Sequence, residues 1–227
     1  MIDSPRPSAS HTELQAVLAE TPRSPDYVLL KHFDLGDCVY RQGEAATHLF
    51  YILKGRVRTY VLSPDGKEKT FFIVGAGDVL NDADFYLQRP HTTNAEAFER
   101  QVEVYQIGRA GFDLIVQQHP ELNQFLLANL AAKTNWLAEE IMRQSFHDVR
   151  GRVQLTLIQL AQQHGVLTSH GLAIDLRITH ETIARLVGAN RVTVSACLSD
   201  LQRDGFYQVI EQRIVLAPWA IGQTLPP

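Results

Sequence analysis

Residues 27–107 contain short apolar runs that are separated by turn-forming residues. Runs of this length, with glycines between them, are typical of a β-sandwich or barrel. Pro64-Asp65-Gly66 separates two of the runs, and because Pro sets φ while Gly accepts a positive φ, we expect a hairpin there. The pattern therefore predicts an all-β domain in the first half of the chain. Its clearest runs are 27–30, 49–53, 57–62 and 70–74.

A second block, residues 112–163, is helical in character, since no glycine lies between Phe112 and Phe146. Asp148 is placed to cap a further helix within it, and a short strand at 172–178 follows. Five residues step by three and four, which puts them on one seam of a long helix. The seam favours a coiled-coil dimer, and the alternative is packing on the chain's own β domain. Its members are Leu127, Leu130, Thr134, Leu137 and Ile141.

Residues 179–201 have the layout of a helix-turn-helix. Ala184 is small where two helices must cross closely, and Gly188, four residues later, permits the turn. Val194, six residues further on, is the expected buried anchor of the second helix. The remaining inward positions are Ile183, Leu186, Val187, Leu198 and Leu201.

The same region carries the candidate contacts to DNA. Thr179 and Asn190 are placed to cap the two helices. Arg191 follows at the start of the second helix, where it can bind a guanine edge through two hydrogen bonds, while nearby hydroxyls suit phosphate oxygens. Two strand-like runs, 206–210 and 213–216, predict a β-hairpin wing and argue against an ordinary helical hairpin in a core. The expected DNA-binding residues are Thr179, His180, Glu181, Asn190, Arg191, Val192, Thr193 and Ser195.

The charge of the chain is unevenly distributed. Its 227 residues hold 21 Lys and Arg against 25 Asp and Glu, a net charge of -4. Residues 1–147 carry 14 basic and 19 acidic side chains, whereas residues 148–227 carry 7 and 6. The stretch Arg177–Arg191 has three arginines and only Glu181 as an acid. This distribution excludes a histone-like, charge-driven binder but is compatible with a dimer that recognises short half-sites.

Cysteine usage and hydropathy limit the class of protein. Cys38 and Cys197 are the only thiols and lie far apart, which excludes a disulfide scaffold and indicates a reducing compartment. No apolar run approaches the roughly 20 residues of a membrane span, and residues 1–25 lack the apolar core of a signal peptide. We therefore expect a soluble, cytoplasmic protein with no membrane partner.

Taken together, these motifs resemble the CRP/FNR family of transcription regulators. The resemblance implies an α+β fold with an N-terminal β-roll (cupin-like jelly roll) sensor domain, a long dimerisation helix and a C-terminal winged helix-turn-helix. It further implies a homodimer on a palindromic operator and contact with RNA polymerase near residues 163–171. The motifs that carry it are 36–37, 42–44, 50–55, 65–66, 77–78, 146–152 and 171–201. The implied segments are 1–26 (N-terminal extension), 27–118 (sensor domain), 119–146 (dimerisation helix) and 147–227 (DNA-binding domain).

Three departures from the family concern the effector. Cyclic nucleotide binders of the family have a Gly-Glu pair for the ribose, an Arg-Ser pair for the phosphate and a Thr-Ser pair for adenine. The corresponding pairs here are Asn81-Asp82, Thr92-Thr93 and Leu137-Ala138. A guanidinium is the natural partner of a phosphate, and no Arg stands in this pair. We therefore expect an unknown small-molecule effector other than cyclic AMP, in a pocket formed by Asn81, Asp82, Thr92, Thr93 and Leu137.

No cofactor is predicted. The N-terminal cysteine cluster of an iron–sulfur centre is missing from the sequence. Nine histidines leave haem open as an alternative, with His48 or His91 as the candidate ligand, although a solvated histidine is the commoner case.

Two other classes of function remain to be weighed. Many relatives have an Arg that reads a guanine at the position of Ala196, so the operator sequence is open. The alternative function is a ligand-binding or haem-sensing module whose helix-turn-helix only contacts protein. Arg191 and the wing argue against that alternative, and salt-dependent DNA affinity distinguishes the two. An enzyme could use Asp82, Asp84 and His91, but no nucleophile elbow, phosphate loop or metal spacing accompanies them, and we expect no enzyme.

Overall fold

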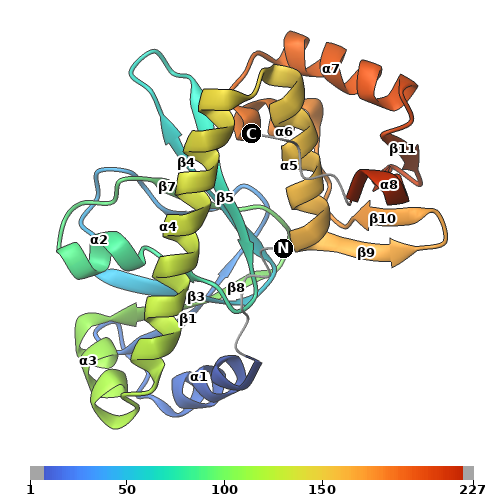
Figure 1. The fold of residues 1–227 in the computed structure, drawn as a ribbon. Coiled ribbons are helices and arrows are strands. Elements are labelled where there is room, and N and C mark those ends of the chain that lie inside the picture. The colour runs from blue at the N-terminus through green and yellow to red at the C-terminus, as the bar shows by residue number, and fades with distance from the viewer. Residues whose placement is uncertain (1–7, 222–227) are drawn as a thin grey trace. The chain divides into compact units, whose positions relative to one another are not determined.

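The computed structural model describes residues 8–221, with side chains from residue 12 onward. The chain divides into two compact units, one ending at Leu137 and the other beginning at Ala138 (Figure 1). Each unit is described here by itself.

Two antiparallel four-stranded sheets build the first unit. One sheet has the strand order β1-β8-β3-β6 and the other β2-β7-β4-β5. The strands are β1 (Val28–Phe33), β2 (Cys38–Tyr40), β3 (His48–Lys54), β4 (Arg56–Leu62), β5 (Glu68–Gly75), β6 (Val79–Leu80), β7 (Asn94–Ala97) and β8 (Val102–Gly108).

An apolar core lies between the two sheets. Ile52 and Val104 of the first sheet are fully buried in one cluster with Val57 and Ala95 of the second. The predicted hairpin is present, because β4 pairs with β5 around a turn in which Gly66 has φ 80°. The β-roll prediction is confirmed, and antiparallel sheets with separate helices make the fold α+β.

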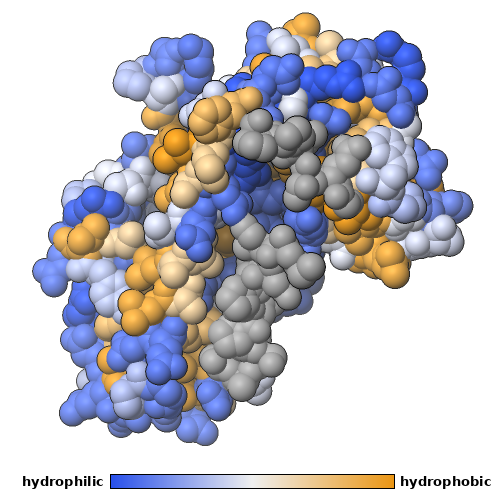
Figure 2. All heavy atoms as spheres, in the orientation of Figure 1, coloured by the Kyte–Doolittle hydropathy of each residue, from blue (hydrophilic) through white to orange (hydrophobic). Residues whose placement is uncertain are grey.

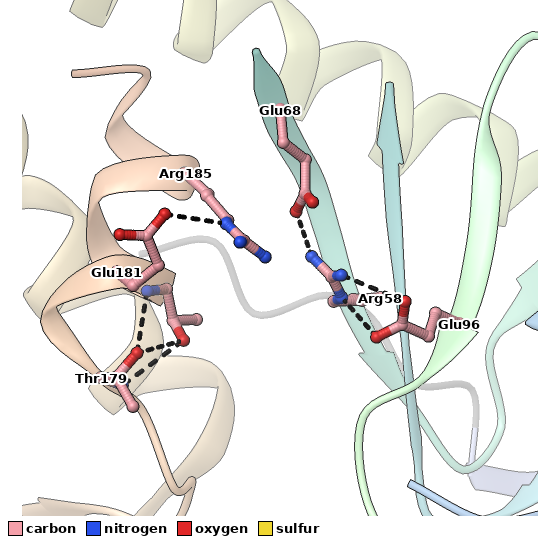
Figure 3. A network of polar contacts seen from close by, with 7 residues as sticks. Arg58, Glu68, Glu96, Thr179, Glu181 and Arg185 are labelled. Carbon is pink, nitrogen blue, oxygen red and sulfur yellow. Dashed lines mark hydrogen bonds and ion pairs between the residues drawn. The ribbon is translucent and has the colours of Figure 1, made fainter. Parts of the chain in front are cut away.

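One cation is buried on the second sheet. Arg58 of β4, only 8% exposed, donates two hydrogen bonds of 3.2 Å to Glu96 of β7 and a further one to Glu68 of β5 (Figure 3). Two carboxylates thus compensate the desolvated guanidinium, and the three strands are joined by ion pairs as well as by their backbones.

Helices cover the outer face of the first sheet with a second apolar cluster. They are α1 (Ser8–Glu20), α3 (Arg109–Gln118) and the first turns of α4 (Leu122–Phe146). Leu18 of α1 and Tyr51 of β3 are fully buried there, and Phe125 of α4 is 4% exposed. The described part of the N-terminal extension is therefore an ordered helix that contributes to the core; residues 1–7 lie outside the described residues.

The predicted helical block consists of three helices. α3 ends at Gln118, α4 begins at Leu122, and α5 (Val149–His164) follows Asp148, whose carboxylate accepts a hydrogen bond of 2.8 Å from the Gly151 amide. The cap predicted at Asp148 is confirmed. A short helix that the sequence pattern did not indicate, α2 (Asp82–Leu87), begins after Asn81, whose φ of 64° is left-handed.

The second unit packs three helices on a four-stranded sheet. Val153 of α5, Ile183 of α6 and Val194 of α7 are fully buried between them. The sheet order is β11-β12-β10-β9, all antiparallel. Besides α5 the elements are β9 (Gly165–Thr168), β10 (Gly171–Ile174), α6 (His180–Val187), α7 (Arg191–Arg203), β11 (Tyr207–Ile210), β12 (Arg213–Leu216) and α8 (Pro218–Ile221).

The stretch 163–178 differs from its predicted structure. Residues 165–168, within the stretch where contact with RNA polymerase is expected, form strand β9, which pairs with β10, and the strand expected at 172–178 ends at Ile174. Pairing at the sheet edge satisfies backbone groups of β9 although its side chains are all exposed. Within the described residues, no helix has the length and apolar character that a membrane span requires.

Candidate functional site

The first helix of the predicted helix-turn-helix has a complete N-terminal cap. The Thr179 hydroxyl accepts a hydrogen bond of 3.1 Å from the Thr182 amide, and the Thr182 hydroxyl accepts one from the Thr179 amide (Figure 3). At the other end, Gly188 has φ 70° and donates its amide to the Ala184 carbonyl. A residue with a Cβ is disfavoured in that conformation, so glycine makes the turn to α7 possible.

The second helix presents its first turn to solvent. Asn190 caps it, accepting a hydrogen bond of 2.7 Å from the Val192 amide. Val194 is fully buried, whereas Arg191 and Thr193 are exposed and Val192 is 76% exposed. Within the described part of the chain, the Arg191 side chain makes no hydrogen bond or ion pair. The predicted caps and anchor are confirmed, and the first turn of α7 is exposed to solvent.

Two polar pairs lie beside this turn. The Glu181 carboxylate binds the Arg185 guanidinium at 3.2 Å, so the acid among the predicted DNA contacts has a cationic neighbour (Figure 3). His180 Nδ1 and Ser195 Oγ are 2.9 Å apart, which joins the first residue of α6 to α7.

The predicted wing is present as strands β11 and β12. Glu211 and Gln212, at its tip, have φ 47° and 63°, as the central residues of a type I′ turn require. Ile210 and Arg213 are paired across the turn, and the Arg213 guanidinium lies 3.1 Å from the Asp175 carboxylate.

The predicted effector-pocket residues of the roll are arranged around two buried rings. Asn81 Oδ1 contacts His91 Nδ1 at 2.7 Å, while its amide donates to the His48 carbonyl at 2.6 Å. The His91 ring stacks on the Tyr40 ring with 4.2 Å between centroids, and the Tyr40 hydroxyl lies 3.3 Å from the Thr93 hydroxyl. Burial lowers the pKa of His91, which favours the neutral imidazole.

Asp82 is bound by a cation from the long helix. Lys133 Nζ of α4 donates to the Asp82 carboxylate and to the Val79 carbonyl, both at 2.6 Å. The Asp82 side chain is 6% exposed and that of Lys133 19%. Leu137, one turn further along α4, is 41% exposed. Asp82 is thus joined to α4 through Lys133, and no contact recorded for the described residues joins Leu137 to the other pocket residues.

A second carboxylate, Asp84, lies beside Thr92. It accepts hydrogen bonds of 2.8 Å from the Thr92 amide and 2.9 Å from the Thr92 hydroxyl, and Arg89 Nε donates to it at 2.7 Å. Burial by itself would raise the pKa of Asp84, but the bonds from Thr92 and Arg89 outweigh it and the pKa is lowered. Asp84 is therefore a buried, ionised group.

Lys133 and Asp84 were not among the residues predicted for this site. One signal for Lys133 was present, because it is the only lysine after residue 69. The sequence singles out Asp84 only as a possible acid/base group of an enzyme, and the helix that positions it was not indicated by the sequence. A cavity of about 460 Å³ in the roll has none of the predicted pocket residues in its wall; it is lined by His32, Phe33, Asp34, Asp37, Lys54, Gln101 and Glu103.

The two candidate haem ligands do not fit that role in this conformation. His48 uses both ring nitrogens, Nδ1 with the Thr47 hydroxyl at 2.8 Å and Nε2 with the Pro25 carbonyl at 3.3 Å. His91 is 5% exposed and stacked on Tyr40. Ligation of iron by His48 requires these bonds to break, and His91 has no exposed ring to offer.

The predicted seam of α4 is largely exposed, whereas other residues of the helix pack on the roll. Phe125 is buried, and the Trp136 ring lies 4.4 Å from that of Phe72 on β5. Leu127 and Ile141 of the seam are 65% and 67% exposed. Figure 2 shows hydrophobic side chains gathered along the outward side of α4. The alternative, in which the seam packs on the chain's own β domain, is therefore not supported.

A β-roll, a long helix and a winged helix-turn-helix together define a class of two-domain transcription regulators. Residues 30–119 match the cyclic nucleotide-binding domain, and residues 151–220 match the Crp-like helix-turn-helix domain. The chain belongs to the CRP/FNR family, which consists of DNA-binding transcription regulators and not of enzymes.

Among its relatives is the CRP-like cAMP-activated global transcriptional regulator of Mycobacterium tuberculosis, 29% identical over 185 residues, which are 82% of each chain. The cAMP-activated global transcriptional regulator CRP of Escherichia coli is 28% identical over 77% of this chain and 83% of its own.

The fold is shared with solved structures. The c-di-GMP responsive global regulator CLP of Xanthomonas campestris superposes with a TM-score of 0.75, 22% identity and coverage of 91% of this chain and 98% of its own. A CooA mutant from Carboxydothermus hydrogenoformans superposes with a TM-score of 0.72, 26% identity and coverage of 89% and 85%.

Proposed function

We propose that the chain acts as a homodimeric regulator that places α7 in the major groove of a palindromic operator and responds to an effector other than cyclic AMP. The observation that carries the DNA-binding role is the first turn of α7, where Arg191 and Thr193 are exposed while Val194 is buried. A capped helix with this arrangement presents donors to base edges and phosphates. A regulator that binds the operators of its genes works in the cytoplasm.

The dimer is proposed from the exposed seam of α4. Two copies of this helix bury Leu127, Leu137 and Ile141 against each other and leave the roll-facing side of each helix unchanged. We keep the segments as 1–26 for the N-terminal extension, 27–118 for the sensor domain, 119–146 for the dimerisation helix and 147–227 for the DNA-binding domain. Half-sites about one helical turn apart then match the two-fold symmetry.

The proposal against cyclic AMP rests on two buried carboxylates. Several relatives are cAMP-activated regulators by name, and those proteins provide the comparison. In this chain a cyclic phosphate would approach Asp82 and Asp84, whose cations Lys133 and Arg89 are already engaged. The amide and hydroxyl of Thr92, which are suitable donors for a phosphate, bind Asp84 instead. An uncharged or cationic effector fits this environment better than an anion.

Contact with RNA polymerase is proposed at the β9–β10 hairpin. Val166 is 47% exposed and Leu167 83%, on a strand at the sheet edge. Exposed apolar side chains on an edge strand are suited to a protein partner. V166S and L167S together are expected to reduce transcription from a regulated promoter and leave operator affinity unchanged; lost operator affinity would contradict this assignment.

The DNA-binding role is tested by selecting duplexes of about 30 base pairs from a random pool with the purified protein. We expect enrichment of a palindrome, with an affinity that falls steeply as salt rises. Because Ala196 stands where many relatives have an Arg, the selected half-site is expected to lack one guanine of the family operator. Failure to enrich any sequence, with no salt-dependent affinity, would favour a helix-turn-helix that only contacts protein.

A further inference from the structure

His180 and Ser195 form a pair across the two helices of the DNA-binding motif. His180 is the first residue of α6 and is exposed, whereas Ser195 lies one turn into α7 and is half-buried. Their Nδ1 and Oγ atoms are 2.9 Å apart. Both residues are among the predicted DNA contacts, but the bond between them means that they do not act as two independent groups.

The bond engages Nδ1 of His180 and leaves Nε2 as the ring nitrogen available to a partner. A neutral imidazole satisfies this contact in two ways: the Ser195 hydroxyl donates to Nδ1 and the ring hydrogen is on Nε2, or Nδ1 donates to Ser195 Oγ and Nε2 is an acceptor. When the imidazole is protonated, Nδ1 donates to Ser195 Oγ and Nε2 still carries its hydrogen. In the first neutral tautomer and in the protonated ring, Nε2 is a donor on the side of the ring away from Ser195, and these are the states that a phosphate oxygen selects. Among the described residues, no group accepts a hydrogen bond from His180 Nε2.

The surroundings of the ring favour a negatively charged acceptor. Glu181, the neighbouring acid, is bound by Arg185, and Arg191 lies at the start of α7 without an ion pair in the described chain. In helix-turn-helix proteins, the first helix crosses the sugar-phosphate backbone while the second enters the groove. A donor on the first residue of α6 is therefore suited to a phosphate oxygen.

We propose that His180 donates Nε2–H to a DNA phosphate and that Ser195 is a positioning residue, which holds the imidazole through Nδ1 rather than contacting DNA itself. This inference rests on the proposed DNA-binding function and adds to it a specific phosphate contact and an indirect role for the serine. It also predicts that removal of Ser195 has no effect once the His180 ring has lost its nitrogens.

A double-mutant cycle tests the pair. The probe is the duplex selected by the wild-type protein from the random pool, titrated at one fixed salt concentration and pH. We expect H180F to weaken binding about tenfold and S195A about threefold. The double variant H180F/S195A should bind like H180F alone, and H180Q, which keeps a donor, should regain most of the affinity. S199A is the matched control, because Ser199 donates to the Ser195 carbonyl from the same helix, and it should bind like the wild type.

Each result has a separate meaning. Additive losses in H180F and S195A would show that Ser195 contacts DNA by itself and would overturn the proposal, as would wild-type affinity in H180F. If circular dichroism shows that H180F does not fold, the DNA affinities of H180Q and S195A still test the proposal. H180Q keeps a donor and should retain most of the affinity, so equal tenfold losses in H180Q and S195A would overturn the proposal. Absence of DNA binding by the wild-type protein would instead contradict the proposed function, so the two failures are distinguishable.

Discussion

Lys133 of the long helix and Asp82 at the start of α2 form an ion pair of 2.6 Å in the roll. The same ammonium also donates to the Val79 carbonyl, so one side chain connects α4 to the end of β6 and the start of α2. Asp82 is one of the residues that the sequence resemblance predicts for the effector pocket. This predicted pocket carboxylate is thus already bound by a cation of the same chain.

Removal of the cation should destabilise the roll. K133M leaves the Asp82 carboxylate buried without its partner, and we expect a loss of about 3 kcal/mol in the free energy of unfolding. The measurement is urea unfolding followed by the fluorescence of Trp136 in a W219F background, which removes the other tryptophan. K67M is the matched control, since Lys67 pairs with Asp65 on the surface, and its midpoint should not move. Equal midpoints for K133M and K67M would contradict the role of the pair.

The second carboxylate makes a prediction for acid stability. The folded-state pKa of Asp84 lies below its unfolded value, so its stabilising contribution is complete above the unfolded pKa, about 3.9, and is lost as pH falls through the folded pKa. D84N should therefore be less stable than the wild type at neutral pH by about 1–3 kcal/mol, with the difference shrinking below about pH 4. Urea midpoints for both proteins across this pH range measure it. A difference that is constant with pH would exclude an ionised Asp84 as its cause.

The turn of the helix-turn-helix depends on a single backbone conformation. Gly188 has φ 70°, where an L-residue other than Asn or Asp is strained by roughly 1–2 kcal/mol. We expect G188A to lower the thermal stability of the C-terminal unit and to weaken operator binding, and G188N to do so less. Calorimetry and gel-shift titration measure the two effects. If G188A and G188N were equally stable, the strain argument would fail.

The seam of α4 predicts the oligomeric state. The wild-type protein should sediment as a dimer, and I141D should sediment as a monomer, because one buried charge in each copy opposes association. Ile141 is 67% exposed in the single chain, so the variant should still fold. E139A is the control on the same helix. A monomeric wild type, or an I141D protein that stays dimeric, would contradict the proposed interface.

The sequence predicted the elements of the fold more completely than the pocket. Caps such as Asp148 and Asn190 and the turn at Gly188 are local chemistry, readable from neighbouring residues. The Lys133–Asp82 pair joins residues 51 positions apart, and only the packing of α4 on the roll brings them together. Leu137, placed in the pocket by alignment, is partly exposed on α4, since alignment does not determine which face of a helix is buried.

The central claim, a regulator that recognises DNA through the first turn of α7, is tested most directly by operator affinity as a function of salt for the wild type, R191A and R203A. Arg203 lies at the far end of the same helix and pairs with Asp200, so R203A is the matched control. We expect R191A to lose about 1–3 kcal/mol of specific binding per half-site while R203A keeps wild-type affinity. Undiminished operator affinity in R191A would contradict the claim.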